Sequence, residues 1–597
     1  MWYLDGMSAL FFSRSVNKSA SKTATLSSKV PARPLHAALS KESGVVGEAK
    51  DFHWLKTNIP CQAACPAGTN IPGYLEAIAQ GDFAQAYRIN LEDNVFPAAL
   101  GRVCTRPCEP ACRHGWKGLG EPVAICFSKR SAADFLSRNE PVVLEKLFPP
   151  TGKRVVVVGA GASGLAAARD LARYGHAVTV LEKHAAPGGM MVQGIPPFRL
   201  PRDLVEREIG QIRALGVEIK CGVEVGNLDD LAKTYDAVVL AVGTTKVNRP
   251  DLPGVQARGV HHGLDFLKAV HAGETMTPGP RVVVIGGGFT AVDCARTARR
   301  LGGTEVGVYY RRSVSEMYIT PGEVEEMAHE GIGFETQVSP EAILENDGVV
   351  CGVRFIRTRP GKPDAQGRRG FEPVAGSAFE VPADTVLLGT GQTADTSWMP
   401  AVQPSKVVIT GDFAAGARSL IDAIADGRRT ARQVDALLMG GERLRDAVSI
   451  EAASGTGRTR EMDELPRQAM PVRPLAERGP AVEVETGYAE EIARTEAKRC
   501  YLCHYKYEID NELCIYCDRC LKVKPVEGCI VKVREMIYDE AGRITGYHRS
   551  TGAKDYNLLY IDQSQCIRCG ACKDVCPVAC IDIQKVSAKT VSMKELQ

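Results

Sequence analysis

Cysteines gather near both ends of this chain, and their spacing limits what it can fold around. Near the C-terminus, a triplet with two residues between neighbours precedes a second such triplet and a Cys-Pro pair. In ferredoxins with two [4Fe–4S] clusters, the cysteine before the proline ligates the cluster of the other triplet. Structural zinc seldom uses such triplets, and disulfide frameworks belong to small secreted domains. We therefore predict a cluster at Cys514, Cys517, Cys520 and Cys576.

The second triplet needs a fourth ligand from elsewhere in the chain. The bacterial ferredoxin spacing places it at position 524, where this chain has Lys524 followed by Pro525. Cys529 is the nearest candidate, so we expect the loop 521–528 to be an enlarged form of the usual turn. The predicted ligands of this cluster are Cys529, Cys566, Cys569 and Cys572.

The cysteines near the N-terminus follow a less regular pattern, beginning with Cys61 and Cys65-Pro66. The stretch from Gly101 through Cys104 and Cys108 to Cys112 resembles the cluster-binding domain of the glutamate synthase small subunit, which also occurs in dihydropyrimidine dehydrogenase. The resemblance implies an α-helical iron–sulfur domain. In that family an Arg-Cys-x-x-Cys motif precedes the Cys-x-x-x-Cys-Pro motif, but nothing similar precedes Cys61 here.

The missing motif occurs instead at residues 499–503, on the far side of the nucleotide-binding core. The resemblance implies that this segment folds back and completes an N-terminal cluster held by Cys61, Cys112, Cys500 and Cys503. A further cluster then has three cysteine ligands, which are Cys65, Cys104 and Cys108.

The fourth ligand of that further cluster is a Glu or Gln in the family, and the matching position here is Lys129, which cannot ligate iron. Cys126 lies three residues earlier on the same helical face, and we predict that it substitutes. The alternative is a buried free cysteine acting as a small apolar side chain. Four sets of four ligands leave four of the 20 cysteines. Three are interpreted as packing residues and the fourth could compete as a ligand: Cys221, Cys294, Cys351 and, as the competitor, Cys580.

Two glycine-rich turns lie between the cysteine regions. Residues 154–158 form a short β-branched run that is typical of a buried parallel strand. They lead into a GxGxxG turn and a helical stretch, and Glu182 ends the next strand, where a ribose-binding acid belongs. Strand, turn, helix and acid in this register predict a dinucleotide site with a pyrophosphate at the helix N-terminus. Its residues are Gly159, Gly161, Ser163, Gly164 and Glu182.

The second turn follows residues 281–285 and comprises Gly286, Gly288, Phe289, Thr290 and Ala291. The strand after it, at 305–310, ends in Arg311-Arg312-Ser313 rather than in an acid. Two cations and a hydroxyl suit a 2′-phosphate, so the pattern favours NADPH over NADH. The alternative is a solvated basic turn.

The order of the turns also resembles the glutamate synthase small-subunit family, in which the first fingerprint holds FAD and the second, inserted one holds the nicotinamide. This implies that residues 384–391 are the returning strand of the FAD domain. The chain departs from the family at Phe289, where Asn is common. The resemblance implies further FAD-proximal residues: Lys183, Gly189, Met190, Gly243, Gly391, Gly411, Asp412, Ser419 and Asp422.

The predicted fold is multidomain, with a helical iron–sulfur domain, two Rossmann-like α/β domains and an α+β ferredoxin-like domain. The expected boundaries are 1–50 (disordered extension or transit peptide), 51–150 (iron–sulfur domain), 151–279 and 383–440 (FAD domain), 280–382 (NADPH domain), 441–505 (a strap returning to the N-terminal domain) and 506–597 (ferredoxin domain).

A net charge of +2 gives no reason to expect a nucleic-acid partner, and no apolar run approaches the length of a membrane span. From Gly6 to Lys41 there are six Lys or Arg and no acid, which suits a transit peptide or a disordered extension. We expect the cytoplasm, with the mitochondrion as the alternative.

These features together predict an FAD-dependent NADPH oxidoreductase with about four [4Fe–4S] clusters, which exchanges electrons with a catalytic subunit of a larger complex or with a soluble ferredoxin. The arrangement resembles flavoprotein subunits of NADP-linked 2-oxoacid:ferredoxin oxidoreductases. Alternatives are a glutamate synthase small subunit and a stand-alone or bifurcating NADPH:ferredoxin oxidoreductase. A disulfide reductase is disfavoured because residues 152–440 contain only isolated cysteines.

Overall fold

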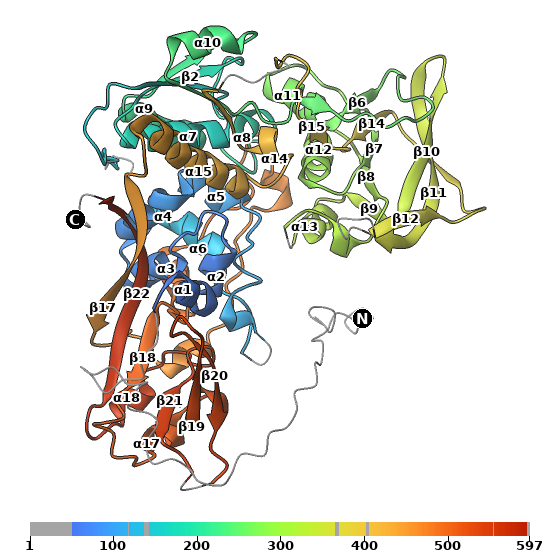
Figure 1. Ribbon diagram of the computed structural model, residues 1–597. Helices are drawn as coiled ribbons and strands as arrows, with labels where there is room; N and C mark the ends of the chain where they lie inside the picture. Colours follow the sequence, from blue (N-terminus) through green and yellow to red (C-terminus); the bar gives the residue numbers. More distant parts are fainter. Residues whose placement is uncertain are drawn as a thin grey trace, which may run out of the picture.

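The computed structural model describes residues 50–116, 119–136, 142–320, 322–363, 369–400, 405–552 and 555–593. Nearly all of the expected N-terminal extension therefore lies outside the described residues. Figure 1 shows a helical region in the middle of the molecule, with the first nucleotide-binding sheet on one side of it, the C-terminal strands on the other, and the second nucleotide-binding sheet beside the first. In the described part of the chain, no helix is both long enough and apolar enough to cross a membrane.

Six α-helices form most of the described part of the N-terminal region. Side-chain oxygens cap three of them, as at Asp51, which accepts a hydrogen bond from the Trp54 amide at 2.9 Å. Two of the predicted ligands end helices, because Cys65 is the C-cap of α2 and Cys104 is the C-cap of α5. The helices are α1 (Phe52–Asn58), α2 (Pro60–Ala64), α3 (Ile71–Gln80), α4 (Phe83–Asn94), α5 (Pro97–Val103) and α6 (Ile125–Phe135).

The first nucleotide-binding sheet is parallel; its strand β4 is wholly apolar and β1 is apolar after Arg154, as burial on both faces requires. Its order is β16 (Val407–Ile409), β4 (Ala237–Leu240), β1 (Arg154–Val158), β2 (Ala177–Glu182) and β3 (Glu218–Cys221). Helices α7 (Ala162–Arg173) and α15 (Leu420–Met439) pack closely on each other. A Cβ at Gly427 of α15 would come within 2.1 Å of the Ser163 carbonyl, so only glycine permits this approach. Smaller helices complete this part: α8 (Met190–Gln193), α9 (Arg202–Ala214), α10 (Leu228–Thr234) and α14 (Asp412–Ala415).

The second parallel sheet carries the second glycine-rich turn. Its order is β6 (Val260–His262), β14 (Thr385–Leu388), β7 (Arg281–Ile285), β8 (Glu305–Tyr310) and β9 (Gly333–Thr336). It is accompanied by α11 (Gly263–His271), α12 (Phe289–Arg300) and α13 (Glu323–His329), and by an antiparallel group of β10 (Val338–Asn346), β11 (Val349–Pro363), β12 (Arg369–Pro373) and β13 (Phe379–Pro382).

The assignment of residues 384–391 to the FAD domain is wrong, because β14 pairs with β6 and β7 in the second sheet. The strand that returns to the first sheet is β16, which pairs with β4. The chain crosses between the sheets at a two-stranded link of β5 (Lys246–Val247) and β15 (Gln392–Thr393). A buried β-branched run predicts a strand but carries no information about which parallel sheet receives it.

The C-terminal part consists of two small sheets. One has the order β17 (Leu444–Ala453), β22 (Ile581–Ser592), β18 (Tyr505–Ile509), and the other has β20 (Ile544–Arg549), β19 (Ile530–Tyr538), β21 (Leu558–Ile561). Short helices α17 (Arg519–Val523) and α18 (Ala571–Asp574) carry cysteines. The predicted strap therefore contains a strand, β17, that pairs with the last strand of the chain. It also contains α16 (Glu490–Lys498), which packs on α3 and α6.

Candidate redox site: two nucleotide turns and four cysteine groups

The first nucleotide turn joins β1 to α7. The Glu182 carboxylate at the end of β2 accepts hydrogen bonds from the Ala160 amide at 2.8 Å and the His184 amide at 2.9 Å, so it is fixed against the turn. A Cβ at Gly161 would meet no atom within 4 Å, which leaves open space beside the N-terminus of α7. This space and the helix N-terminus together fit a pyrophosphate.

Other residues predicted to lie near the FAD surround the same turn. A Cβ at Gly189 would lie 2.8 Å from the Gly161 Cα, and one at Gly411 would lie 2.6 Å from the Ser163 Cβ. Burial raises the pKa of Asp412 to about 6. Ser419 and Asp422 form a capping box at the N-terminus of α15. These groups fit a bound dinucleotide whose anionic and polar parts face two helix N-termini.

The remaining predicted FAD residues are less closely grouped. Gly391 lies on the link between the sheets, where its carbonyl accepts from the Asn248 amide at 3.1 Å and contacts the His262 Nε2 at 3.2 Å. Gly243 has a left-handed φ of 66°. Lys183 is exposed, as is 38% of Met190.

The second turn joins β7 to α12, with Gly288 as the helix N-cap. Phe289 makes an edge-to-face contact of 5.9 Å with Tyr318, which sequence reasoning missed. Burial and the nearby Asp422 raise the pKa of Tyr318, and its ring carries a hydroxyl that bonds the Ser419 side chain. Tyr318 thus joins the second nucleotide turn to the N-terminus of α15. In the sequence it is an ordinary aromatic in a polar loop and gives no signal.

The basic pair lies at the end of β8, as predicted. The Arg311 guanidinium stands 5.0 Å over the Phe371 ring, and the Nε of Arg312 is buried without a hydrogen-bond partner. The hydroxyl expected to assist them is already used, because Ser313 donates to a carboxylate oxygen of Glu316 at 2.7 Å. The geometry therefore offers two cations, but not the free hydroxyl, to a 2′-phosphate.

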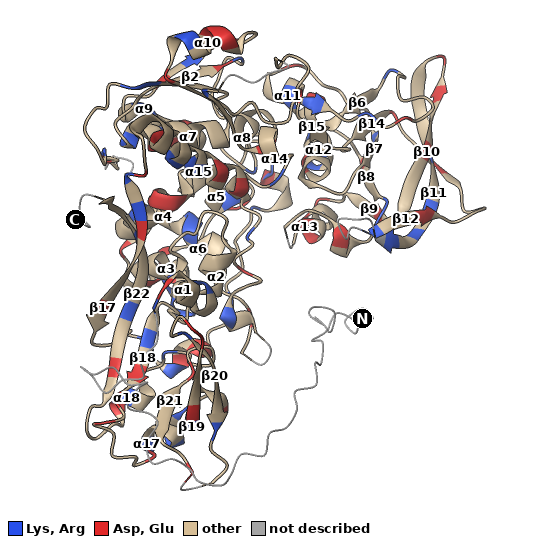
Figure 2. Cartoon of the chain, in the orientation of Figure 1, with Lys and Arg blue, Asp and Glu red and all other residues tan. Residues whose placement is uncertain are grey.

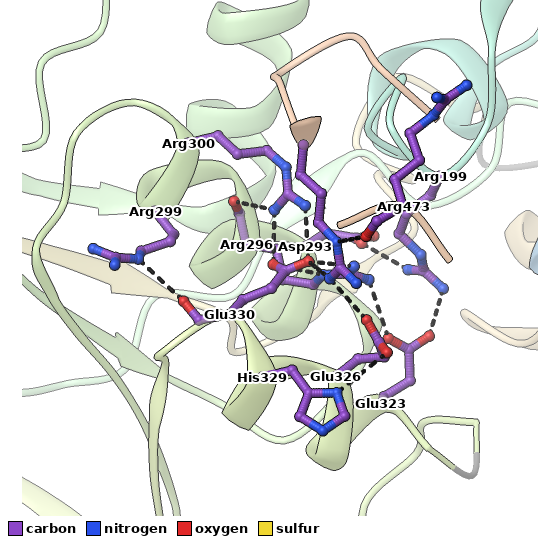
Figure 3. A network of polar contacts seen from close by, with 11 residues as sticks. Arg199, Asp293, Arg296, Arg299, Arg300, Glu323, Glu326, His329, Glu330 and Arg473 are labelled. Atoms are coloured by element: carbon purple, nitrogen blue, oxygen red, sulfur yellow. Dashed lines mark hydrogen bonds and ion pairs between the residues drawn. The ribbon is translucent and has the colours of Figure 1, made fainter. Parts of the chain in front are cut away.

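An ionic network holds the second sheet beside the first (Figure 3). Arg199, from the segment before α9, bonds Asp293 of α12 at 2.6 Å and Glu323 of α13 at 2.8 Å. Glu330 bonds Arg296 and Arg300 at 2.8 Å and Arg478 of the strap at 3.0 Å. Burial alone would raise the pKa of Glu330, but its arginine partners lower it to about 2. The network therefore joins three parts of the chain that lie far apart in the sequence.

Two cysteine groups lie in the helical region. The fold-back group consists of Cys61, Cys112, Cys500 and Cys503. Burial raises the pKa of Cys61, and the negative charges of the other three cysteines raise it further. Cys61 therefore lies near Cys500 and Cys503, although about 440 residues separate them in the sequence. The flavin-side group consists of Cys65, Cys104, Cys108 and Cys126, which line one cavity together with Lys129 and with Ile421 of α15.

Lys129 faces the flavin-side group from α6. It is 6% exposed, and although burial alone would lower its pKa, Cys104 and Cys126 raise it. The Sγ of Cys126 donates to the Leu100 carbonyl at 3.3 Å, and Cys104 together with burial raises the pKa of Cys126. Cys126 is thus close enough to act as the substitute ligand, and Lys129 adds a positive charge beside it.

Two further groups lie in the C-terminal part. The inner group consists of Cys529, Cys566, Cys569 and Cys572, and burial followed by Cys566 raises the pKa of Cys529 to about 12. Lys524 donates to the Ile530 carbonyl at 3.1 Å and so stabilises the enlarged turn. The outer group consists of Cys514, Cys517, Cys520 and Cys576, which line one cavity.

Cys580 lines the cavity of the outer group as well. Its Sγ lies 3.5 Å from the Cys576 Sγ, and burial, Cys576 and Cys514 raise its pKa. The outer group therefore has five neighbouring sulfurs. Among the described residues, no three His, Cys, Asp or Glu side chains gather tightly enough to hold a single metal ion.

The four groups follow one another through the molecule. Cys108 of the flavin-side group is a neighbour of Cys61 in the fold-back group. Arg113 contacts Cys503 of the fold-back group and Cys566 of the inner group. Cys520 of the outer group raises the pKa of Cys572 in the inner group, so these two groups are neighbours as well. The spatial order is therefore flavin-side group, fold-back group, inner group and outer group. Since Cys517 of the outer group is exposed, this series leads from the N-terminus of α15 to the surface.

These features define a class, namely a pyridine-nucleotide oxidoreductase with two nucleotide sites and attached iron–sulfur domains. Three family models agree with this class: pyridine nucleotide-disulphide oxidoreductase over residues 153–412, dihydropyrimidine dehydrogenase domain II with a 4Fe-4S cluster over 45–141, and a 4Fe-4S binding domain over 559–582.

Curated relatives identify the family. The chain is 35% identical to the NADP(+)-dependent formate dehydrogenase subunit beta of Moorella thermoacetica over 74% of its own length and 70% of the relative. It is 34% identical to the glutamate synthase [NADPH] small chain of Escherichia coli, over 62% and 87%, and 40% identical to the NADPH-Fe(3+) oxidoreductase subunit beta of Geobacter sulfurreducens, over 58% and 52%. The chain belongs to this family of NADPH-linked, FAD- and iron–sulfur-dependent oxidoreductase subunits.

Proposed function

We propose that the chain is the electron-transfer subunit of a larger redox complex. FAD occupies the first nucleotide turn, NADPH the second, and four [4Fe–4S] clusters the four cysteine groups. The observation that carries this proposal is the order of the groups, which lead from the N-terminus of α15 to an exposed cysteine at the surface. A chain that used flavin and nicotinamide alone would have no need of such a series.

The cofactors supply the electron chemistry when bound, because flavin accepts the two-electron hydride of a nicotinamide and gives up electrons singly to iron–sulfur clusters. The protein supplies position and charge. Glu182 binds the FAD ribose, while Arg311 and Arg312 recognise the 2′-phosphate of NADPH. Asp412 and the N-terminus of α15 face the flavin.

The partner is a separate catalytic subunit in this proposal. A 2-oxoacid:ferredoxin oxidoreductase remains our first candidate. The second candidate is a formate-oxidising subunit, which is favoured by the name of the relative that aligns over 74% of the chain. A soluble ferredoxin is the third, and we propose the cytoplasm as the compartment.

The test uses the full chain, purified and assayed without oxygen. We expect about sixteen iron atoms per chain, four for each of four cysteine groups. We also expect NADPH to bleach the flavin and to reduce a viologen dye faster than NADH does. About eight iron atoms would overturn the four-cluster assignment, and faster bleaching by NADH would overturn the assignment of the arginine pair.

The surface end of the series can be tested separately. Cys517→Ser alters the exposed member of the outer group, so dye reduction should fall while NADPH still bleaches the flavin at the wild-type rate. Cys351→Ser is the matched control because Cys351 is also exposed but lies in β11. Equal losses of dye reduction and of flavin bleaching in the Cys517 variant would contradict the proposed order, in which the outer group is the last of the four.

A further inference from the structure

Two arginines lie between the fold-back group and the inner group, and we call Arg113 and Arg568 the junction pair. Arg113 contacts the Cys503 Sγ at 3.6 Å and donates to the Cys566 carbonyl at 3.2 Å and the Ser564 carbonyl. Arg568 donates to the Tyr505 carbonyl at 3.0 Å, the Cys503 carbonyl at 3.4 Å and the Cys566 carbonyl. Both side chains therefore touch predicted ligand residues of two different clusters.

The junction pair is buried without an acid. Arg113 is 2% exposed and Arg568 is 0% exposed. Neither guanidinium has a carboxylate within ion-pair distance among the described residues, and their contacts are carbonyls, a sulfur and, for Arg113, the Trp116 ring at 5.5 Å. A buried charge is strongly unfavourable unless an opposite charge accompanies it. The nearest candidates for that opposite charge are the cysteine thiolates.

A third buried arginine nearby, Arg458, is neutralised in the usual way, by an ion pair with a carboxylate. Arg458 is 6% exposed and donates to the Ile567 carbonyl, but it also pairs with Asp463 at 2.5 Å. Arg458 thus has its counter-charge among the protein's own carboxylates. The junction pair differs because, in the described part of the chain, neither guanidinium has such an acid, while both contact residues of the two cysteine groups.

We propose that the junction pair is the counter-charge of the two clusters on either side of it, and that it raises the reduction potentials of both. This inference rests on the proposed function, which assigns clusters to the fold-back and inner groups. A cluster with four thiolate ligands is anionic and gains a further negative charge on reduction. A fixed cation within a few ångströms in a dry interior therefore favours the reduced form.

The same placement assists transfer across the junction. One electron leaves one cluster and enters the other, so one cluster is oxidised and the other is reduced by one electron, with no bond formed or broken. Because the junction pair contacts both sides, it stabilises the electron on either side. The pair therefore shifts both potentials in the same direction and adds no energetic step of its own between them.

The experiment is an anaerobic redox titration of the full chain, followed by electron paramagnetic resonance. Arg113→Met and Arg568→Met remove the charges and keep most of the apolar stem. At a fixed poised potential, each should lower the reduced-to-oxidised ratio of the fold-back and inner clusters about tenfold, equivalent to about 59 mV for a one-electron couple. The other two clusters should not shift, and Arg568→Lys should remain near wild type.

Arg458→Met combined with Asp463→Asn is the control, because it removes a buried arginine together with its own acid and so leaves the net charge beside the two clusters unchanged; it should leave all four ratios within about twofold. Unchanged ratios in both junction variants, or equal shifts in all four clusters, would overturn the proposal. If a Met variant loses iron, Arg113→Gln is titrated, since its amide still donates to the carbonyls; iron loss there too means a structural role and also overturns it. Wild-type protein with fewer than four clusters would instead refute the proposed function.

Discussion

Glu76 of α3 fastens the N-terminal helices to the C-terminal part, and replacing it by Gln should loosen that contact. Its carboxylate accepts from the Tyr505 hydroxyl at 2.6 Å and pairs with Lys585 at 2.7 Å and with His504 at 3.4 Å. Burial alone would raise the pKa of Glu76, but the nearby His504 and hydrogen bonds from Lys585 and Tyr505 lower it from 4.5 to about 2.

The magnitude follows from this lowering of the pKa. It corresponds to at most about 3 kcal/mol of stabilisation by the ionised carboxylate, and solvent screening on its open side reduces this to about 2 kcal/mol. Because the folded-state pKa lies below the ordinary value, the contribution is present above about pH 4.5 and is lost as the pH falls toward 2. At neutral pH, Glu76→Gln should therefore show the whole effect.

Hydrogen-exchange mass spectrometry measures the opening of this contact without unfolding the whole chain. Peptides covering β18 should lose about thirtyfold in protection in the variant, equivalent to about 2 kcal/mol. Glu451→Gln is the control, since Glu451 pairs with Lys589 across β17 and β22 but both side chains are more than half exposed, and such pairs contribute little. Unchanged protection of β18 in the Glu76 variant would refute the reasoning.

Three further predictions concern cofactors. Replacing both Arg311 and Arg312 by Ala should raise the KM for NADPH at least about 100-fold, because each removes a charge-assisted hydrogen bond of about 1.5–3 kcal/mol; an equal rise for NADH would contradict 2′-phosphate recognition. Cys500→Ser should lower the iron content by about four atoms per chain, and wild-type iron content would refute the fold-back. Cys126→Ser should alter the electron paramagnetic resonance signal of a single cluster, and an identical spectrum would mean that Cys126 is a packing residue.

The features that could be predicted from the sequence are those formed by residues close together in the chain or by a recognised motif. The strand, turn, helix and acid around Gly161 and Glu182 follow one another within about thirty residues, so the sequence alone predicts their geometry. The ferredoxin spacing pointed to position 524, where Lys524 stands, and the nearest cysteine, Cys529, was predicted to substitute; in the structure Cys529 lies beside the second triplet. The family resemblance predicted the approach of Cys500 to Cys61, and this too is present in the structure. Iron ligation by these residues stays a prediction.

What failed or went unnoticed depends on long-range packing. The strand β14 was assigned to the wrong sheet, because a buried apolar run is compatible with either. The junction pair and Tyr318 act through contacts between segments that are distant in sequence, and no spacing rule marks them. Mixed charge continues throughout the described chain (Figure 2), so an important buried arginine does not stand out from the many ordinary ones.

The fold-back group also imposes an order on biosynthesis. Cys61 and Cys112 leave the ribosome long before Cys500 and Cys503, so for most of translation this site has only half of its thiolates. Iron delivered early would meet an open, oxidisable pair. In the proposed assignment, this cluster is therefore completed only after residue 503 has been made, and a nonsense mutation before codon 500 would leave the fold-back group with two of its four thiolates.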